Sequence, residues 1–323
     1  MAELPVLTID LGGTKIRTAI ISGDGRMIAE DYRLSLADEG PEAVMQRIFT
    51  GIEELLDKES LRLSMIHSIG IASAGIIDIN RGLITHSPNL LGWRDIPLRH
   101  LVADKYGIDT FLLNDASAAA LGEHRYGAGK GVKNLIYLTV STGIGGGIII
   151  EDKLYLGASG CAGELGHMTI KTDSSSCQCG NNGCLETLAS GTAMAREAKE
   201  RIGAGENTVL VEMAKGVIED ITAETISIAA RNGDSLALAV ISEAASYLGV
   251  GMANLVNIFN PEMIIIGGGA SKIGDLLFNP AIQEMRRRAF KLTAQAVRVV
   301  PAELGGNAEV IGVAIFAREQ KTG

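Results

Sequence analysis

Apolar residues recur along the chain with two different periods, and each period predicts one kind of element. Short runs of apolar, often β-branched residues, such as residues 6–10 and 263–266, are typical of buried strands. Other segments, such as the one that Pro41 opens, repeat their apolar residues every three to four positions and are typical of helices with one buried face. Strands and helices alternate along the 323 residues, which predicts an α/β protein.

The order of these elements indicates an internal repeat. The predicted strands are residues 6–10, 16–21, 27–34, 66–72, 110–113, 135–141, 147–150, 153–156, 263–266 and 297–300. The predicted helices begin at Pro41 and cover residues 98–106, 116–123, 189–202, 222–232, 234–248, 250–259, 280–290 and 307–317. Strand, glycine-rich turn, strand, tight turn and strand occupy residues 6–34 and return at residues 135–156. We interpret this as a weak repeat, although many α/β proteins contain such units by coincidence; two halves facing each other would form a cleft with a glycine loop on each wall.

Composition and charge narrow the function. Forty glycines, many in clusters, suggest loops whose backbone closely approaches a ligand. The net charge of −9 argues against nucleic acid as the main partner, and the one basic run, residues 286–288, is interpreted as a solvated helix face. The sequence shows no secretory signal and no apolar run of the roughly 20 residues that cross a bilayer. We therefore expect a soluble, cytoplasmic protein without a membrane partner.

Residues 163–186 hold three of the four cysteines, one histidine and two glutamates. The three cysteines and the histidine are Cys177, Cys179, Cys184 and His167. This spacing is typical of a Cys₃His zinc site. A disulfide is the alternative, but it is not expected in a large chain with four cysteines and no secretory signal. Cys161 is interpreted as a small buried residue rather than a ligand.

Three glycine-rich turns each follow an apolar strand. They are Asp10-Leu-Gly12-Gly13-Thr14-Lys15, Ser141-Thr142-Gly143-Ile-Gly145-Gly-Gly147 and Gly267-Gly268-Gly269. Such turns allow backbone N–H groups to point at an anion. The first lacks Walker A spacing and is as consistent with an ordinary hairpin as with a phosphate cradle, and the third with a plain strand-to-helix bend. The second is the stronger signal, because four glycines in five residues oppose strand formation. Together the turns suit a nucleotide.

Asn114 and Asp115 lie where a predicted strand ends and a helix begins. An isolated aspartate there is most often a helix N-cap, and the functional alternative is a general base in phosphoryl transfer. Glu164, Glu186 and Asn89 are either solvated loop residues or, with Asn114, a rigid hydrogen-bonding set for sugar hydroxyls. The glycine turns and the zinc spacing nearby favour the functional interpretation.

The motifs together resemble those of the ROK family of sugar kinases over essentially the whole chain. The matching motifs are Asp10-x-Gly-Gly-Thr-Lys15, Leu113-Asn-Asp-Ala-x-x-Ala-Ala-Leu-Gly-Glu123, Thr142-Gly-Ile-Gly-Gly-Gly147, Gly163-Glu-Leu-Gly-His167 and Cys177-x-Cys-Gly-x-x-Gly-Cys-Leu-Glu186. The segment from Ser87 through Asn89 and Trp93 to Pro97 resembles the glucokinases of the family. As a set these motifs are highly specific.

The resemblance implies the actin-like ATPase fold of hexokinases and ribonuclease H, with two α/β domains around a central cleft. We expect one domain from residues 1–117 plus 305–323, closed by the C-terminal helix. The other, residues 118–304, would carry the zinc loop.

The resemblance also implies an ATP-dependent glucokinase that phosphorylates glucose at O6, a reaction of glycolysis, with Asp115 as the catalytic base. The implied sugar-binding residues are Gly75, Asn89, Asn114, Asp115, Glu164, His167 and Glu186. The implied residues for ATP and Mg²⁺ are Asp10, Gly12, Gly13, Thr14, Lys15, Thr142, Gly143, Gly145, Gly267, Gly268 and Gly269. The implied ligands of a structural Zn²⁺ are His167, Cys177, Cys179 and Cys184.

Several alternatives stay open within this resemblance. The same constellation serves kinases for N-acetylmannosamine, N-acetylglucosamine, fructose or mannose, since pocket shape decides between similar sugars. Polyphosphate could replace ATP as the donor. The family also includes sugar-responsive repressors with a helix-turn-helix ahead of the sugar-binding part, for which a first strand so near Met1 leaves no room. The family's habit suggests a homodimer or homotetramer.

Overall fold

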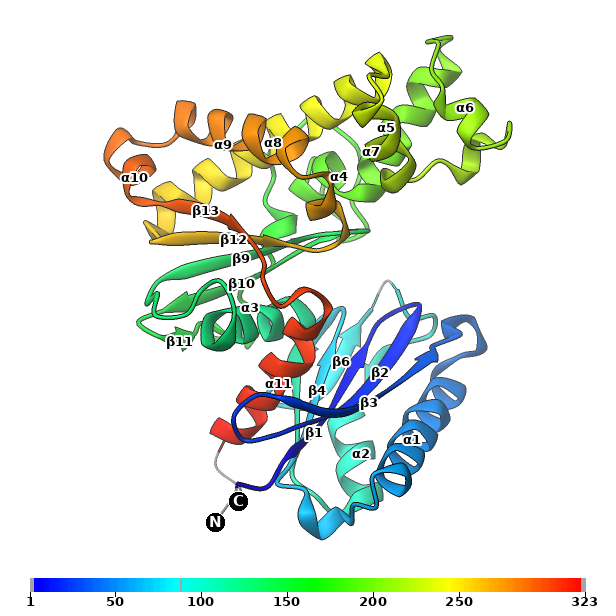
Figure 1. Ribbon diagram of the computed structural model, residues 1–323, viewed down its shortest axis with the longest axis vertical. Helices are drawn as coiled ribbons and strands as arrows, with labels where there is room; N and C mark the ends of the chain where they lie inside the picture. Colours follow the sequence, from blue (N-terminus) through cyan, green and yellow to red (C-terminus); the bar gives the residue numbers. More distant parts are fainter. Residues whose placement is uncertain (1–2, 88, 321–323) are drawn as a thin grey trace. The chain divides into compact units, whose positions relative to one another are not determined.

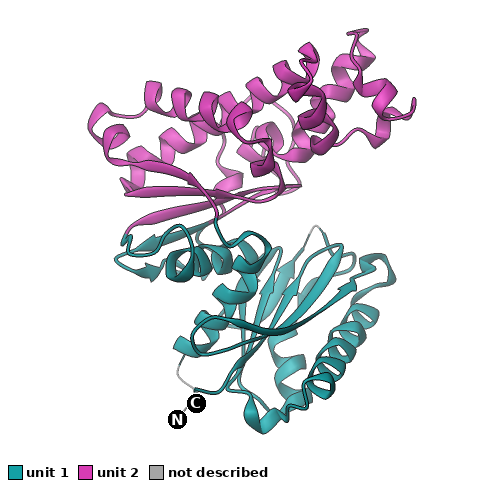
Figure 2. Cartoon of the chain, viewed as in Figure 1, with its two compact units in different colours: residues 1–133, 147–163, 303–323 teal, residues 134–146, 164–302 magenta. Residues whose placement is uncertain are grey.

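The computed structural model describes residues 3–87 and 89–320. It divides into two compact units (Figure 2). Unit 1, teal, contains residues 1–133, 147–163 and 303–323, and unit 2, magenta, contains residues 134–146 and 164–302. We describe each unit by itself.

The first sheet has five strands in the order β3-β2-β1-β4-β8 (Figure 1). The strands are β1 (Val6–Leu11), β2 (Lys15–Ile21), β3 (Met27–Leu34), β4 (Ile69–Ser73) and β8 (Thr110–Asn114). The first three pair antiparallel, which confirms the predicted meander, and β4 and β8 add in parallel. A sheet of mixed direction follows from the short turns between the first strands and the helical connection before β8.

Helices cover both faces of this sheet. They are α1 (Pro41–Lys58), α2 (Leu98–Tyr106), α3 (Asp115–Tyr126) and α11 (Ala308–Glu319). Alternation along β1 directs Leu7, Ile9 and Leu11 into a core shared with α1 and α2, whereas Val6 packs in a second core with α11. Asp10 has the same parity as Val6, which places it on the α11 side of the sheet.

A small sheet follows β4 that the sequence analysis did not anticipate. Its antiparallel strands are β5 (Ile76–Asp78), β6 (Leu83–His86) and β7 (Arg94–Ile96). The segment between β6 and β7 carries Asn89 and ends at the buried Trp93. Pro88, part of the glucokinase-like segment, lies outside the described residues. These strands are too short and irregular to leave a period in the sequence.

The second five-stranded sheet repeats the order of the first: β11-β10-β9-β12-β13. Its strands are β9 (Leu135–Val140), β10 (Ile144–Ile150), β11 (Lys153–Leu154), β12 (Met263–Gly267) and β13 (Arg298–Pro301). In both sheets the third, second, first, fourth and fifth strands along the chain are neighbours in that order. The internal repeat inferred from the sequence is therefore confirmed at the level of topology.

The glycine-rich stretch after β9 corrects one expectation. The sequence analysis read residues 142–146 as a turn before a strand at residues 147–150, but β10 already begins at Ile144, so that Gly145 and Gly146 are also strand residues. A β-carbon on Gly147 would lie 2.4 Å from the β-carbon of Ala120 on α3. Glycine is present because a helix packs directly on the strand, and close packing outweighs low strand propensity.

Unit 2 is rich in helices, which lie over one face of the strands β9 and β12 (Figure 1). They are α4 (Leu185–Ala189), α5 (Gly191–Gly203), α6 (Leu210–Met213), α7 (Ala223–Arg231), α8 (Ser235–Phe259), α9 (Asp275–Arg288) and α10 (Lys291–Ala296). The two segments predicted at 234–248 and 250–259 form the single helix α8, against which α4, α5, α7 and α9 pack.

Helix α8 also corrects the expectation that no segment is long and apolar enough to cross a bilayer. Among the described residues, this one helix meets that criterion by length and composition alone. Within the fold, 61% of its apolar window is buried. Burial of this kind is typical of the core helix of a globular domain.

The domain boundaries expected from the sequence differ from this division. Residues 118–133 and 147–163 belong to unit 1 by their contacts, whereas the expectation placed them in the second domain. Helix α3 packs along α11, and Gly122 and Gly312 allow the two backbones to approach, because a β-carbon on Gly312 would lie 1.7 Å from the carbonyl oxygen of Ala118. The expected domain boundaries stay a prediction.

Candidate active site and metal centre

In unit 1, Asn114 and Asp115 have separate roles at the start of α3. The Asn114 side chain is the N-cap and accepts a hydrogen bond from the Ser117 amide at 3.1 Å. Asp115 is the first residue of the helix, and its Oδ1 accepts the Ala116 amide at 2.8 Å. Burial raises the pKa of Asp115 above its ordinary value of 3.8, although the Ala116 hydrogen bond opposes the rise. The capping that sequence reasoning considered for Asp115 is performed by its neighbour.

The charge of Asp115 raises the pKa of two further carboxyl groups. Burial raises the pKa of Asp10 well above its ordinary value, and the charges of Glu309 and Asp115 raise it further. Burial likewise raises the pKa of Glu309 to about 7, with a contribution from Asp115. The opposing cation is Arg17, which is 5% exposed and hydrogen-bonds Glu30 and Asn307. This part of unit 1 therefore has excess negative charge, which a bound cation would relieve.

The sequence analysis missed Glu309 because nothing in the local sequence distinguishes it. It is the second residue of α11, nearly 300 positions after Asp10. Only the return of the last helix to the first sheet makes the charges of Glu309, Asp10 and Asp115 interact.

The turn after β1 contacts the segment that carries Asn89. The Gly12 amide donates to the Lys15 carbonyl at 3.0 Å, so this N–H closes the hairpin and does not point at a ligand. A β-carbon on Gly13 would lie 2.5 Å from the Asn89 carbonyl oxygen. Thr14 and Lys15 are exposed. Gly13 thus allows the glycine turn to lie against the backbone of Asn89.

The Asn114 side chain also contacts a third predicted site residue. Its Nδ2 donates to the Gly75 carbonyl at 3.4 Å, and Gly75 has a φ of 115°, which favours glycine. The cap and this contact together engage both ends of the Asn114 amide. The structure therefore gives Asn114 and Gly75 a supporting role beside Asp115, and their sugar contacts stay predictions.

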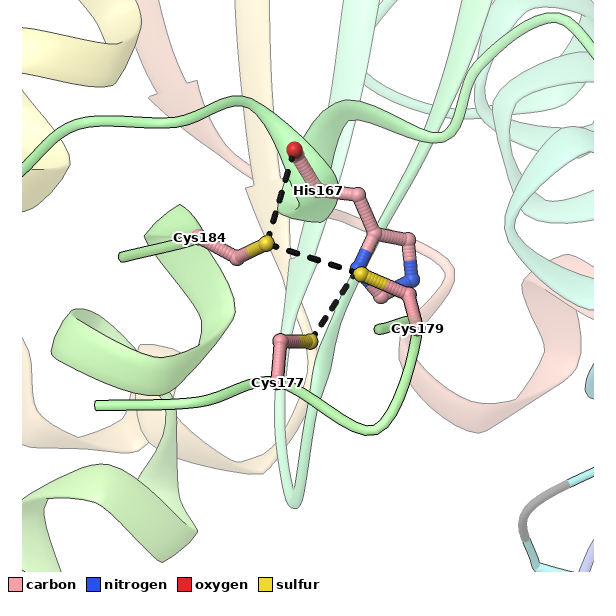
Figure 3. Close-up of side chains that lie close together, drawn as sticks. All are labelled: His167, Cys177, Cys179 and Cys184. Carbon is pink, nitrogen blue, oxygen red and sulfur yellow. Dashed lines mark hydrogen bonds between the residues drawn. The ribbon is translucent and has the colours of Figure 1, made fainter. Parts of the chain in front are cut away.

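In unit 2, four side chains point toward one another (Figure 3). They are His167, Cys177, Cys179 and Cys184, whose ligand atoms all lie within 4.8 Å of one another. The Sγ atoms of Cys179 and Cys184 are 3.7 Å apart, and Cys177 Sγ lies 3.5 Å from His167 Nδ1. Tetrahedral zinc with bonds of about 2.3 Å to sulfur and about 2.1 Å to nitrogen requires edges of about 3.8 and 3.6 Å. The cluster fits zinc with all four positions filled by protein.

The three thiols of the cluster influence one another's pKa. Burial raises the pKa of Cys184 to about 12, and hydrogen bonds with Cys179 and Cys177 add to the rise. Such a thiol loses its proton at neutral pH only when a metal replaces it. All four cysteines are free, and Cys161 lies outside the cluster with its Sγ 3.3 Å from the Ile77 carbonyl oxygen.

The cluster orients the imidazole of His167 and the carboxylate of Glu164. With Nδ1 at the sulfurs, Nε2 faces the other way and lies 3.8 Å from Glu164 Oε2. Both residues belong to the 3₁₀ turn η3 (Leu165–His167) and its N-cap. Zinc on Nδ1 would leave the hydrogen on Nε2 as a donor beside an exposed carboxylate.

Glu186, on α4, contacts the glycine turn between β9 and β10. Its Oε2 accepts the Ile144 amide at 2.8 Å. The sequence analysis expected only a sugar contact for this carboxylate.

A cavity of about 650 Å³ in unit 2 adjoins the same turn. Ser141, Thr142 and Gly269 line it, together with the N-terminal ends of α5 and α7. Polar and charged side chains reach it from residues that the sequence analysis did not identify: Thr192, Thr222, Glu224, Arg231 and Lys272. Two helix N-termini and two glycine turns suit a ligand with phosphate groups. In the sequence, the residues at the starts of α5 and α7 show only the pattern of helix caps, which does not indicate a ligand site.

The three glycines after β12 have different environments. Gly267 is a buried strand residue, where a β-carbon would lie 2.2 Å from the Tyr137 hydroxyl oxygen. Gly268 has a φ of 82° and contacts the Val140 carbonyl, and Gly269 lines the cavity. Gly267 therefore packs against the core, and of the three only Gly269 lines the cavity.

Comparison with known proteins establishes the family and the fold. A model of the ROK family matches residues 6–320, which is nearly the whole chain. The chain belongs to the ROK family. The expected actin-like fold is confirmed by a solved ROK glucokinase from Streptomyces griseus in complex with glucose and AMPPNP, with a TM-score of 0.85 and 35% identity over 98% of this chain and all of that one.

Curated relatives of two kinds match this ROK chain. A glucokinase from Thermotoga maritima is 35% identical over 320 residues, covering 99% of both proteins. A xylose repressor from Caldicellulosiruptor bescii is 36% identical over 95% of this chain and 76% of the repressor. The family is therefore established, and the two kinds of relative define the functions to be weighed.

Proposed function

We propose that this sugar kinase of the ROK family is an ATP-dependent glucokinase that transfers the γ-phosphoryl group of ATP to O6 of glucose. The observation that carries the proposal is the match to glucokinases along their entire length, at about 35% identity in both sequence and structure. A half-buried aspartate that directly follows the residue capping its helix supports a kinase within the family.

Asp115 would accept the proton of the sugar hydroxyl as that oxygen attacks phosphorus. Burial raises its pKa, which makes the carboxylate a stronger base than an ordinary aspartate. Asp10 would order Mg²⁺ through water, and this cation would offset the charges of Asp115 and Glu309. Mg²⁺ supplies charge neutralisation for the transferring phosphoryl group.

The proposed sugar-binding side chains in unit 2 are Glu164, His167 and Glu186, all in the zinc-supported segment. In unit 1 the proposed sugar-binding side chain besides Asn114 and Asp115 is Asn89. Zinc would have a structural role, because four protein ligands leave no open position for substrate. ATP would occupy the 650 Å³ cavity, with its phosphates toward Thr142 and Gly269. A cytoplasmic location and a homodimer or homotetramer stay predictions.

Steady-state kinetics across a hexose panel test the proposal. With ATP as donor, we expect kcat/KM for glucose to exceed that for N-acetylmannosamine, N-acetylglucosamine, fructose and mannose by at least about tenfold. A higher kcat/KM for another sugar would reject glucose as the substrate. Polyphosphate in place of ATP tests the donor in the same assay.

The match to xylose repressors supports a second candidate, a sugar-responsive regulator. The matched part of the repressor leaves about a quarter of its length unaccounted for, since 76% is covered. Retention of a labelled operator library by the purified protein tests this candidate. Sequence-selective retention that a sugar reverses would favour regulation over catalysis.

A further inference from the structure

The side chain of Glu186 joins the zinc-supported segment to the glycine turn at the cavity. Glu186 follows the cluster residue Cys184 by two positions and lies in the first turn of α4. Its Oε2 accepts the amide of Ile144, the first residue of β10, at 2.8 Å. A hydrogen bond from a backbone amide to an ionised carboxylate is stronger than one to a neutral acceptor.

Gly143, which has no β-carbon, leaves room for the carboxylate of Glu186. A β-carbon on Gly143 would lie 2.3 Å from Glu186 Oε2 and 3.1 Å from its carboxyl carbon, and its other close neighbour is also an atom of Glu186. Gly143 is not among the residues with positive φ, so its backbone conformation would accept alanine. Among the described residues, the close contact that requires glycine here is therefore with Glu186.

The backbone that follows Glu186 holds the other side of the same turn. The Glu186 carbonyl accepts the Ser190 amide at 3.2 Å, where α4 passes into α5. The next residue, Gly191, donates to the Ser141 carbonyl at 2.7 Å, and Thr192 Oγ1 donates to the Thr142 carbonyl at 2.7 Å. Residues 186–192 thus contact both ends of the turn that lines the cavity.

One oxygen of Glu186 is available for a second role. In the part of the chain that the structure describes, Oε2 has the Ile144 contact, whereas no protein hydrogen bond to Oε1 is present. A carboxylate accepts at both oxygens, so Oε1 is free for a sugar hydroxyl while Oε2 keeps its amide.

We propose that Glu186 is a positioning residue for the phosphate-binding turn, and that through it sugar binding and nucleotide binding strengthen each other. This inference rests on the proposed function, in which the cavity binds ATP. A sugar hydroxyl on Oε1 restrains the side chain, and the restrained Oε2 restrains the turn from Gly143 to Ile144. The coupling is reciprocal, since each ligand raises the affinity for the other by the same factor.

Nucleotide affinity in the absence of sugar separates this role from sugar contact. We would measure AMPPNP binding to zinc-loaded, full-length protein by calorimetry, with and without saturating glucose. Glu186→Ala should weaken sugar-free AMPPNP binding about tenfold or more and remove the gain that glucose gives. Glu186→Gln keeps a neutral acceptor for the Ile144 amide, so its loss of sugar-free AMPPNP affinity should be smaller.

Glu164→Gln is the matched control. Glu164 belongs to the same proposed sugar-binding set, and its Oε2 lies 3.8 Å from Nε2 of His167. This variant should weaken glucose binding and leave sugar-free AMPPNP affinity within about twofold of wild type.

A double-mutant cycle between Gly143 and Glu186 gives an independent test. Gly143→Ala alone should weaken sugar-free AMPPNP binding, because the methyl group displaces the carboxylate. In the Glu186→Ala background the same methyl group contacts no carboxylate, so Gly143→Ala should cause little further loss of AMPPNP affinity. Additive losses would show that the two residues act separately.

The proposal is overturned if Glu186→Ala raises the KM for glucose while sugar-free AMPPNP affinity stays at the wild-type value. That result leaves the glucokinase proposal standing. Conversely, a wild-type preference for another hexose rejects glucokinase and leaves the nucleotide measurements valid with that hexose. If the wild-type protein binds no AMPPNP, both proposals fail. Zinc content is measured for every variant, and Glu186→Gln and Gly143→Ala provide the test if Glu186→Ala does not fold.

Discussion

At the scale of single residues, the chemistry of Asp115 depends on its neighbours. Asn114 caps helix α3, which leaves Asp115 out of the capping interaction. Burial raises the pKa of Asp115, and the charge of Glu309 acts on the adjacent Asp10 in the same sense. The assignment of a base therefore rests on environment rather than on residue type.

Replacement of the proposed base should separate turnover from binding. We expect Asp115→Asn to lower kcat by about 10²- to 10⁴-fold, because the amide cannot accept the hydroxyl proton. The KM for glucose should change far less. Asp104→Asn, at an exposed position on α2, is the control and should retain full activity. A wild-type kcat in Asp115→Asn would reject the assignment.

Glu309 should make stability depend on pH. Its folded pKa of about 7 lies above the ordinary 4.5, so the folded protein binds more protons than the unfolded chain between these values. Stability from this residue is complete below about pH 4.5 and is lost as pH rises toward 7. Glu309→Gln should flatten this slope and raise the free energy of unfolding at pH 8 by on the order of 1–3 kcal/mol. Urea denaturation at several pH values measures this, with Glu319→Gln as control; an unchanged slope contradicts it.

At the scale of elements, the position of α3 depends on close packing against α11. Gly312 lies where a β-carbon would be 1.7 Å from the Ala118 carbonyl oxygen, and a β-carbon on Gly122 would be 2.4 Å from the Ala308 carbonyl oxygen on α11. The two helices therefore cannot separate without moving the start of α3, which carries Asp115.

Gly312→Ala should thus affect both stability and turnover. We expect the free energy of unfolding to fall by about 1–3 kcal/mol or more, since overpacking forces the backbones apart. The kcat should fall as well. Gly203→Ala, also in a helix but with open space at the β-carbon, should be neutral or stabilising. Thermal unfolding and kinetics measure both effects, and equal behaviour of the two variants would refute the packing argument.

The zinc loop is the second element with a predicted effect. We expect Cys179→Ser to lose zinc and to raise the KM for glucose, because the segment that carries His167 and Glu186 loses its support. Cys161→Ser, outside the cluster, should retain zinc. Metal content and glucose KM are measured together. An unchanged KM in zinc-free protein would show that the metal does not support the sugar site.

At the scale of the whole molecule, the two five-stranded sheets have the same strand order but position different functional groups. The first sheet positions Asp10 and Asp115, and the second ends in the glycine turns at the cavity. The chain returns to unit 1 at residue 303, where its backbone contacts Glu123. Glu123 is the last residue of the motif that begins at Leu113 and contains Asp115. The buried Glu123 carboxylate accepts the amides of Glu303, Leu304 and Ala128.

Glu123→Gln should therefore destabilise the protein at this return point. In wild type each of these backbone N–H groups has a carboxylate oxygen as acceptor. In the variant the glutamine NH₂ group would face one of them and leave a buried donor unsatisfied. We expect a loss of about 1–3 kcal/mol in the free energy of unfolding, measured by urea denaturation. Glu303→Gln changes an exposed side chain and keeps the backbone amide, so it should have little effect. Equal stability of both variants with wild type would contradict this role.

The sequence by itself determined the elements and ligands whose signals are local. The predicted helix at residues 98–106 and strand at residues 27–34 match the structure, because their periodicity and bounding residues lie within the segment. The spacing from Cys177 to Cys184 indicated for the same reason that these cysteines lie close together, and the structure confirms that they form a cluster.

Tertiary structure alone decided what depends on residues distant in sequence. It placed Gly145 and Gly146 in a strand, brought Glu309 to the two aspartates, lined the cavity with α5 and α7, and directed Glu186 to Ile144. Each of these rests on a contact or charge across many positions, which no local period records. The role of a side chain at this site depends on the backbone groups that it contacts in the folded protein. The sequence gives the identity of the side chain but not these contacts.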